Sequence, residues 1–278
     1  MSKFYQLGIP SARASALNER PRFVSLGAGV QSSAMLLMLD AGELPGPLPE
    51  AALFADTGWE PQAVYRQLDY LKRTVKRIPI HQVNAGSIRR QLLDHAAGRS
   101  RFASPPLYTL APNGVDKGQL RRQCTREFKI EPMLRWLRAR GYGPKRPVLQ
   151  LLGITLDEWQ RMSQSRVQWA AVAWPLIDAR MTRGSCLAWL ADRGHPEPPK
   201  SACIGCPFRS RFGWSTLTPA EREDAIEVDA AIRRLPKMRA STFLHRDCKP
   251  LSEIDLRSPK ERGQLSVLDG ECGGWCEA

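Results

Sequence analysis

The chain lacks long apolar runs, and it contains little histidine and comparatively little acid. No segment is apolar over the length that a bilayer-spanning helix requires, and residues 1–10 lack the apolar stretch of a signal peptide. The four histidines among 278 residues are far apart, without the spacing of metal ligands. These absences argue against a membrane protein, a secreted protein and a histidine-based centre, so we expect a cytoplasmic protein.

The scarcity of acidic residues leaves a large positive charge. Lys and Arg number 41 against 28 Asp and Glu, a net charge of +13. A positive field concentrates polyanions, so RNA or DNA is the first partner to consider. The alternative is that the excess arginine solvates helix faces and attracts a small anionic nucleotide, because the charge is spread over several helices and loops.

The most informative stretch runs from Arg22 to Leu39, where a short apolar run meets glycines and then an apolar helical segment. It is neither the Gly-Lys-Ser/Thr phosphate loop nor the G-x-G-x-x-G dinucleotide loop. A strand, tight turn and helix N-terminus still favour a bound anion, most simply phosphate, although an ordinary turn without ligand fits the same residues. The residues expected to contact the nucleotide here are Ser25, Gly27, Ala28, Gly29, Val30, Gln31, Ser32 and Ser33.

A second apolar run ends in Asp56, Thr57 and Gly58, with Pro61 positioned to begin another helix. In a parallel sheet both strand ends lie at the same edge, where ligands bind in open α/β folds. We therefore expect Asp56 beside the phosphate turn, where it would hold Mg²⁺ or a ribose hydroxyl.

Strand and helix patterns alternate along most of the chain, which predicts a parallel α/β sheet with right-handed crossovers. We expect further strands at 78–83, 147–153 and 170–176 and helices at 61–76, 88–97, 121–140, 182–193 and 218–235. Residues 98–118 are rich in Gly, Pro, Ser and Asn and predict a long loop over the ligand edge. The expected organisation is a flexible arm at 1–20, a nucleotide-binding domain at 21–207 and a helical extension with a cysteine-containing tail at 208–278.

Several motifs in this order resemble the phosphoadenosine phosphosulfate (PAPS) reductase-like group of the PP-loop ATP pyrophosphatase superfamily, also called adenine nucleotide alpha hydrolase-like. The glycine turn resembles its pyrophosphate loop, and Asp56-Thr-Gly58 its Asp-Thr-Gly strand end. Further similar segments, from about residue 22 to the end, are Cys124-x4-Lys129-x-x-Pro132, the Gly153 to Arg161 loop with Asp157, Pro175-Leu176, Cys203-x-x-Cys206 and Glu271-Cys-Gly273. The resemblance implies a Rossmann-like parallel sheet of about five strands with helices on both faces, Gly153 at the nucleotide, and a mostly helical C-terminal extension.

Cys203 and Cys206 have the spacing with which two thiolates bind one metal centre, and Pro207 is common beside iron–sulfur ligands. The resemblance brings Cys124 to the same place, with Cys272 or Cys276 as the fourth ligand or one iron left open. We favour a [4Fe–4S] cluster over Zn²⁺ or an unligated pair, although the spacing fits all three. Of the other cysteines, Cys186 is expected in the core and Cys248 is undecided.

Two classes of enzyme fit one such site. In the first, ATP with Mg²⁺ adenylates a nucleobase or another oxygen, pyrophosphate leaves and sulfur replaces AMP, with Arg161 or Arg122 neutralising charge. In the second, implied by the resemblance, PAPS or its non-phosphorylated relative APS transfers a sulfite group to Cys272, and a thioredoxin-type reductant releases it. A third interpretation is a nucleotide-sensing or nucleic-acid-binding module without activity. The catalytic candidates are Cys272, Arg161 and Asp157; the sequence leaves the sulfur donor and a homo-oligomer open.

Overall fold

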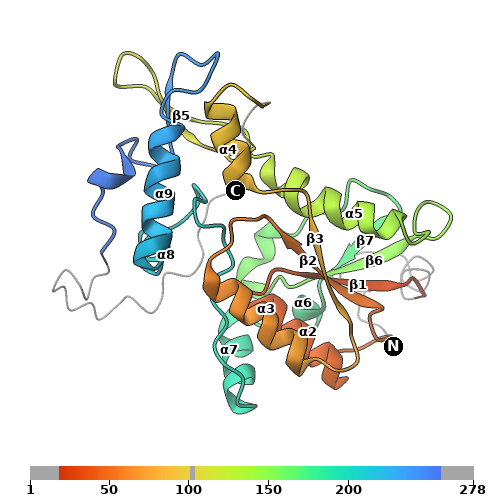
Figure 1. The fold of residues 1–278 in the computed structure, drawn as a ribbon. Coiled ribbons are helices and arrows are strands. Elements are labelled where there is room, and N and C mark those ends of the chain that lie inside the picture. Colours follow the sequence, from red (N-terminus) through yellow and green to blue (C-terminus); the bar gives the residue numbers. More distant parts are fainter. Residues whose placement is uncertain (1–18, 101–103, 258–278) are drawn as a thin grey trace.

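The computed structural model describes residues 19–100 and 104–257. Its centre is a sheet of five parallel strands in the order β3-β2-β1-β6-β7 (Figure 1). The strands are β1 (Arg22–Leu26), β2 (Ala51–Asp56), β3 (Ile80–Asn84), β6 (Val148–Leu152) and β7 (Ala170–Ala173). The predicted Rossmann-like α/β fold is confirmed, with the helical C-terminal part that the sequence also predicted.

Both faces of this sheet are covered, as the unbroken apolar pattern of its strands requires. Along β2 every residue is buried, and the residues alternate between two cores: Ala52 and Phe54 on one side, Leu53 and Ala55 on the other. Figure 1 shows α2 (Val30–Ala41), α3 (Gln62–Thr74) and α7 (Arg183–Asp192) on the first side, with α5 (Glu131–Arg138) across the sheet. Both faces of the central sheet are therefore covered, and a ligand could approach it only at its edges.

A second, smaller sheet is antiparallel, in the order β5-β4-β8. It contains β4 (Tyr108–Leu110), β5 (Lys117–Gln119) and β8 (Ser241–Phe243). The prediction of a structureless loop at 98–118 is therefore wrong for its second half, because Tyr108 pairs with Phe243, which is remote in sequence.

The remaining helices connect and flank the two sheets. They are α4 (Ile88–Ala96), the π-helix η2 (Thr125–Ile130), η3 (Leu156–Arg161), α6 (Pro175–Asp178), α8 (Arg211–Ser215), α9 (Pro219–Ala231) and η4 (Leu251–Glu253). The predicted helix 121–140 thus begins only at Cys124, and the predicted strand 170–176 stops at Ala173 because Pro175 opens a helix. The helix predicted over 218–235 has the expected capping box at Thr218 and Glu221 but ends at Ala231.

A third core lies between the two sheets and the C-terminal helices. Trp214, Leu92 and Leu107 are fully buried in it, and Phe128 and Val228 join them. These residues come from both sides of the predicted domain boundary at residue 207, so the helical extension packs on the sheet domain through a shared core. In the part of the chain that the structure describes, no helix combines the length and apolarity needed to span a bilayer.

Asp229 organises the end of this extension. Its buried carboxylate accepts the N–H groups of Leu244 at 2.8 Å and Leu251 at 3.0 Å and pairs with Arg233. Removing it would leave two buried N–H groups and one guanidinium without their acceptor, which is costly in a low-dielectric interior.

We expect Asp229→Ala to lower the free energy of unfolding by about 3 kcal/mol, because it breaks a buried charged network. Urea denaturation followed by circular dichroism measures this. Glu223→Ala, on the exposed side of the same helix, is the control and should change the stability by less than about 0.5 kcal/mol. Equal effects of the two variants would contradict the role given to Asp229.

Candidate functional site

The predicted phosphate turn and the predicted carboxylate lie at the same edge of the sheet. Strands β1 and β2 are parallel with Leu26 opposite Phe54, so Gly27 and Asp56 both follow at the carboxyl end. Strand β6 pairs with β1 on the other side, with Leu152 opposite Ser25, which brings Gly153 to the same edge. This shared position, expected from the sequence, is confirmed.

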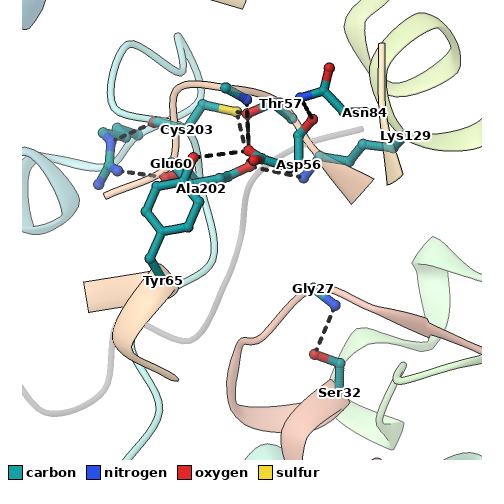
Figure 2. A network of polar contacts seen from close by, with 12 residues as sticks. Gly27, Ser32, Asp56, Thr57, Glu60, Tyr65, Asn84, Lys129, Ala202 and Cys203 are labelled. Carbon is teal, nitrogen blue, oxygen red and sulfur yellow. Dashed lines mark hydrogen bonds and ion pairs between the residues drawn. The ribbon is translucent and has the colours of Figure 1, made fainter. Parts of the chain in front are cut away.

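The turn itself is held by one serine. The N–H of Gly27 donates to Oγ of Ser32 at 3.2 Å, and that hydroxyl donates to the carbonyl of Gly29 at 3.3 Å, as Figure 2 shows for Gly27 and Ser32. Ala28 has a left-handed φ of 54°, and Gly29 begins helix α2 without any side-chain cap. The first N–H groups of α2 therefore have no acceptor within the helix, and its positive dipole end faces the sheet edge.

Some residues of the predicted turn are buried in the protein instead of lying open at the sheet edge. Val30 and Ser33 are buried on the core side of α2, where Ser33 accepts a hydrogen bond from Gln67 at 3.4 Å. Gln31 is half-buried in the first turn of the helix. Ser25, Gly27, Gly29 and Ser32 remain as the residues that shape the turn.

Two neighbouring segments pack closely against the turn, so that a Cβ would clash with backbone at Gly153 and be tightly packed at Gly29. A Cβ on Gly153 would lie 2.9 Å from the backbone N and Cα of Ser32, and one on Gly29 would lie 3.1 Å from Cβ of Ser201. The proline-rich segment that precedes Cys203 thus also covers the glycine turn through Ser201. Ser201, which contacts the turn, is followed closely in the sequence by Cys203.

The carboxylate of Asp56 accepts hydrogen bonds from other groups of the protein. Its Oδ1 accepts the N–H of Gly58 at 2.8 Å and the hydroxyl of Tyr65 at 2.9 Å, and Oδ2 accepts the Gln82 amide at 2.8 Å. Burial, reinforced by this contact with Asp56, raises the pKa of Tyr65. The carboxylate thus fixes the loop after β2.

The loop after β2 leads directly to the cysteine pair. Thr57 is fully buried; its hydroxyl donates to Oε1 of Glu60 at 2.9 Å and lies 3.2 Å from Sγ of Cys203. Oε1 of Glu60 also accepts the Cys203 thiol at 3.5 Å and lies 4.0 Å from Nζ of Lys129 (Figure 2). Gly58 has a φ of 66°, which suits glycine, and a Cβ there would lie 2.8 Å from Ser87.

Three of the predicted metal ligands converge around Lys129. Burial alone would lower the pKa of its ammonium group, but the Glu60 carboxylate and the sulfurs of Cys203, Cys206 and Cys124 together raise it. Burial likewise raises the thiol pKa of Cys203 and of Cys206, with Glu60 adding to the effect at Cys203. Without a bound metal ion, the protonated thiol is therefore the favoured form of Cys203 and Cys206.

Arg209 and Trp59 fix the cysteine loop. The buried guanidinium of Arg209 donates to four main-chain carbonyls, with no carboxylate among these acceptors: Ala202 at 2.7 Å, Cys203 at 3.1 Å, Ile204 at 3.0 Å and Gly213 at 2.7 Å. The carbonyl of Trp59 accepts the Ile204 N–H at 2.8 Å. The indole ring of Trp59 fills the space that a Cβ on Gly205 would need.

Thiolates are the donors that iron–sulfur clusters and structural zinc sites use. Within residues 19–100 and 104–257, however, no group of three or more His, Cys, Asp or Glu side chains is arranged to hold a metal ion. The predicted ligands Cys272 and Cys276 lie outside the described residues. The three described thiols therefore supply suitable donors without a finished metal site.

The other catalytic candidates make local contacts. The Asp157 carboxylate accepts the N–H of Arg183, at 3.1 Å from Oδ1 and 3.2 Å from Oδ2, and so caps the start of α7. Arg161 is exposed and pairs with Glu158 at 2.7 Å. The third candidate, Cys272, falls outside the described residues. Cys186 is fully buried in the core as expected, where burial raises its pKa to about 12.

A small cavity of about 70 Å³ joins the glycine turn to the Glu60 and Lys129 pair. Its lining residues are Ser25, Leu26, Gly27, Phe54, Ala55, Glu60, Lys129, Met133 and Ser201. The volume corresponds to roughly two water molecules, enough for one small polar group of a larger ligand. The cavity thus unites the end of β1, the end of β2, the Cys124 segment and the stretch before Cys203.

The sequence interpretation missed Glu60 and Ser201 and gave Lys129 no role. Lys129 stands in the Cys-x4-Lys motif, so the motif itself was the available signal. Glu60 precedes the helix-initiating Pro61 and Ser201 follows a run of prolines, and neither position has a pattern that marks it as functional.

No protein-family model matches the chain, and a search of curated proteins also finds no match.

We expect Gly205→Ala to lower the free energy of unfolding by about 1–3 kcal/mol, because the new methyl group overlaps the Trp59 ring. The displaced loop should also expose Cys203 and Cys206, so these thiols should react faster with a disulfide reagent such as DTNB. Gly143→Ala is the control, because a Cβ there meets nothing within 4 Å. If both variants have the same thiol kinetics, the loop tolerates the methyl group and the packing argument fails.

Proposed function

We propose that this chain binds an adenine nucleotide at the carboxyl edge of its parallel sheet and uses ATP in sulfur transfer to, or other modification of, a nucleic acid. The observation that carries the proposal is the cavity in which Gly27, Lys129 and Glu60 meet. Four segments far apart in sequence supply its walls, and each resembles a motif of the PAPS reductase-like PP-loop group or lies beside one.

The residues around the cavity suit a phosphate group. The uncapped N-terminus of α2 and the ammonium group of Lys129 both favour negative charge. In adenylation, an acceptor oxygen attacks the α-phosphorus of ATP, the bond to the β-phosphate oxygen breaks and pyrophosphate leaves with the added charge. Fixed positive groups beside the phosphates stabilise that charge as it develops.

The thiols are next to the same cavity, which supports sulfur chemistry. Glu60 lines the cavity and also accepts a hydrogen bond from Cys203. A sulfur nucleophile from a sulfur donor would then displace AMP from the adenylated acceptor. If the thiols hold a cluster, it would supply iron to carry or activate sulfur, and Cys124, Cys203 and Cys206 would hold it.

The charge of the protein supports a nucleic acid as the acceptor. The net charge is +13, and the indole of Trp159 is 60% exposed in η3, where Arg161 also lies. An exposed aromatic ring beside a cation suits a nucleobase.

The second candidate is a PAPS or APS reductase that uses the same nucleotide site. The order of the motifs and the match of Cys272 to a sulfur nucleophile favour it. It requires a thioredoxin-type reductant, and the step at Cys272 depends on the C-terminal tail. A nucleotide or nucleic-acid binding module without activity is the third candidate.

Product assays separate these functions. Pyrophosphate release from ATP, stimulated by RNA or DNA, supports the first candidate. Sulfite release from PAPS that Cys272→Ser abolishes supports the second, and saturable binding of nucleotide with neither product supports the third. Absence of all three would overturn the proposal of a nucleotide site.

We expect Lys129→Met to weaken ATP binding at least about tenfold, because a charge-assisted contact with phosphate is lost. Isothermal titration calorimetry measures the dissociation constant. Lys145→Met, at an exposed position, is the matched control and should bind ATP as the wild type does. Unchanged affinity of Lys129→Met would place the phosphates elsewhere.

We also expect protein purified without oxygen to contain iron and acid-labile sulfide, with an absorbance band typical of a cluster. Cys124→Ala should lose most of the iron and most of the sulfide, because removing one of the three thiol ligands weakens the binding of metal. Cys248→Ala, at a cysteine that contacts the carbonyl of Thr109 instead, should retain both. Zinc in place of iron would favour a structural site. The absence of both metals from the purified protein would overturn the prediction.

A further inference from the structure

The carboxylates of Asp56, at the end of strand β2, and of Glu60, in the loop that follows, differ in how many of their oxygens have hydrogen-bond partners. Asp56 accepts three hydrogen bonds, from Gly58, Tyr65 and Gln82. Glu60 is only 4% exposed; its Oε1 meets Thr57, Cys203 and Lys129, but its Oε2 has no hydrogen-bond partner among the described residues. Leaving a buried acceptor unpaired costs about 1–3 kcal/mol, so such a group calls for a partner.

Glu60 also lines the cavity, whereas Asp56 is not among its lining residues. On the other side of this cavity lies the glycine turn before α2, which favours an anion. A phosphate group bound there would face a carboxylate across a space of about 70 Å³. Lys129 lies 4.0 Å from Oε1, so Oε2 of this cavity-lining residue is left without a partner among the described residues.

A neutral hydroxyl between the two anions would leave their repulsion in place, whereas a divalent cation removes it. Mg²⁺ prefers oxygen ligands, and in nucleotide sites it is typically held by one or two carboxylates together with phosphate oxygens and water. The unpartnered oxygen of Glu60 and a phosphate on the turn are such a pair.

We propose that Glu60, in place of the predicted Asp56, is the carboxylate that binds the Mg²⁺ accompanying the nucleotide phosphates. Through its other oxygen Glu60 also contacts Cys203, so the same side chain connects the cation to the cysteine loop. This inference deepens the proposed function and rests on it, since the cation is that of the bound nucleotide.

The test compares ATP binding in Mg²⁺ with ATP binding in EDTA by calorimetry. Wild-type protein should bind ATP at least about tenfold more tightly with Mg²⁺, and Glu60→Gln should bind with nearly equal affinity in both conditions, because the amide is a poor ligand for the ion. Asp56→Asn should keep the dependence on Mg²⁺ while its melting temperature falls. Glu223→Gln, at an exposed position, is the matched control and should behave as wild type.

If wild-type protein binds ATP but Glu60→Gln retains the Mg²⁺ dependence, or if Asp56→Asn loses it, the role of Glu60 is refuted and the nucleotide site stands. If wild-type protein binds ATP in neither condition, the proposed function falls and this inference falls with it.

A measurement without substitution covers the case in which Glu60→Gln does not fold. Mn²⁺ replaces Mg²⁺ in the wild-type complex with ATP, and electron–nuclear double resonance detects ¹³C in a ligating carboxylate. Protein labelled at the glutamate side-chain carboxyl should show a ¹³C coupling, and protein labelled at the aspartate carboxyl should not. The reverse pattern would overturn the assignment.

Discussion

The parallel pairing of β1 with β2 on one side and β6 on the other is the constraint on which the site depends. Parallel strands end at a common edge, and the crossover helices that parallel pairing requires cover both faces. The glycine turn, the loop of Asp56 and Gly153 therefore meet at this edge, although they are separated widely in sequence. Packing of the sheet thus decides where a ligand can bind before any individual side chain does.

The C-terminal helices complete the site, because they hold the cysteine loop against the sheet. Glu221 contributes to this by accepting the N–H of Gln62 at the start of α3 and the N–H of Thr218 at the start of its own helix, at 2.8 and 2.9 Å. Trp59 adds a hydrogen bond of 2.5 Å to Asp224 of the same helix. The loop that follows β2 is therefore clamped between the sheet and α9.

Local patterns in the sequence were sufficient for the sheet and for most helices, because the strands are continuous apolar runs and the helices start at Pro or at capping residues. They were insufficient where pairing is remote: β4 has only three residues and is stabilised by β8, far along the chain. The extent of β7 was overestimated because Trp174 and Leu176 are as apolar as the strand, although Pro175 already belongs to a helix.

For the candidate site, sequence patterns predicted which segments share one sheet edge, as the strand pairing shows, but could not predict the contacts of their side chains. Asp56 lies where a ligand-binding carboxylate is expected, yet its oxygens accept hydrogen bonds from Tyr65 and Gln82. Neither of these residue types indicates such a bond in the sequence. In the sequence Glu60 looks like any other glutamate, and only its burial next to Cys203 in the folded chain distinguishes it. Such roles follow from the direction of a side chain, which depends on the packed structure.

The arrangement around Arg209 has a consequence for sulfur. Its guanidinium donates to main-chain carbonyls, which are neutral. The carboxylates of Glu60 and Glu221 act on it electrostatically, without a direct hydrogen bond to it among the described residues. Burial raises the pKa of Cys206, and the charge of Arg209, together with a hydrogen bond from the Phe208 backbone, opposes that rise without reversing it. The loop thus contains a buried cation that offsets part of the cost of placing negative charge on its sulfur atoms.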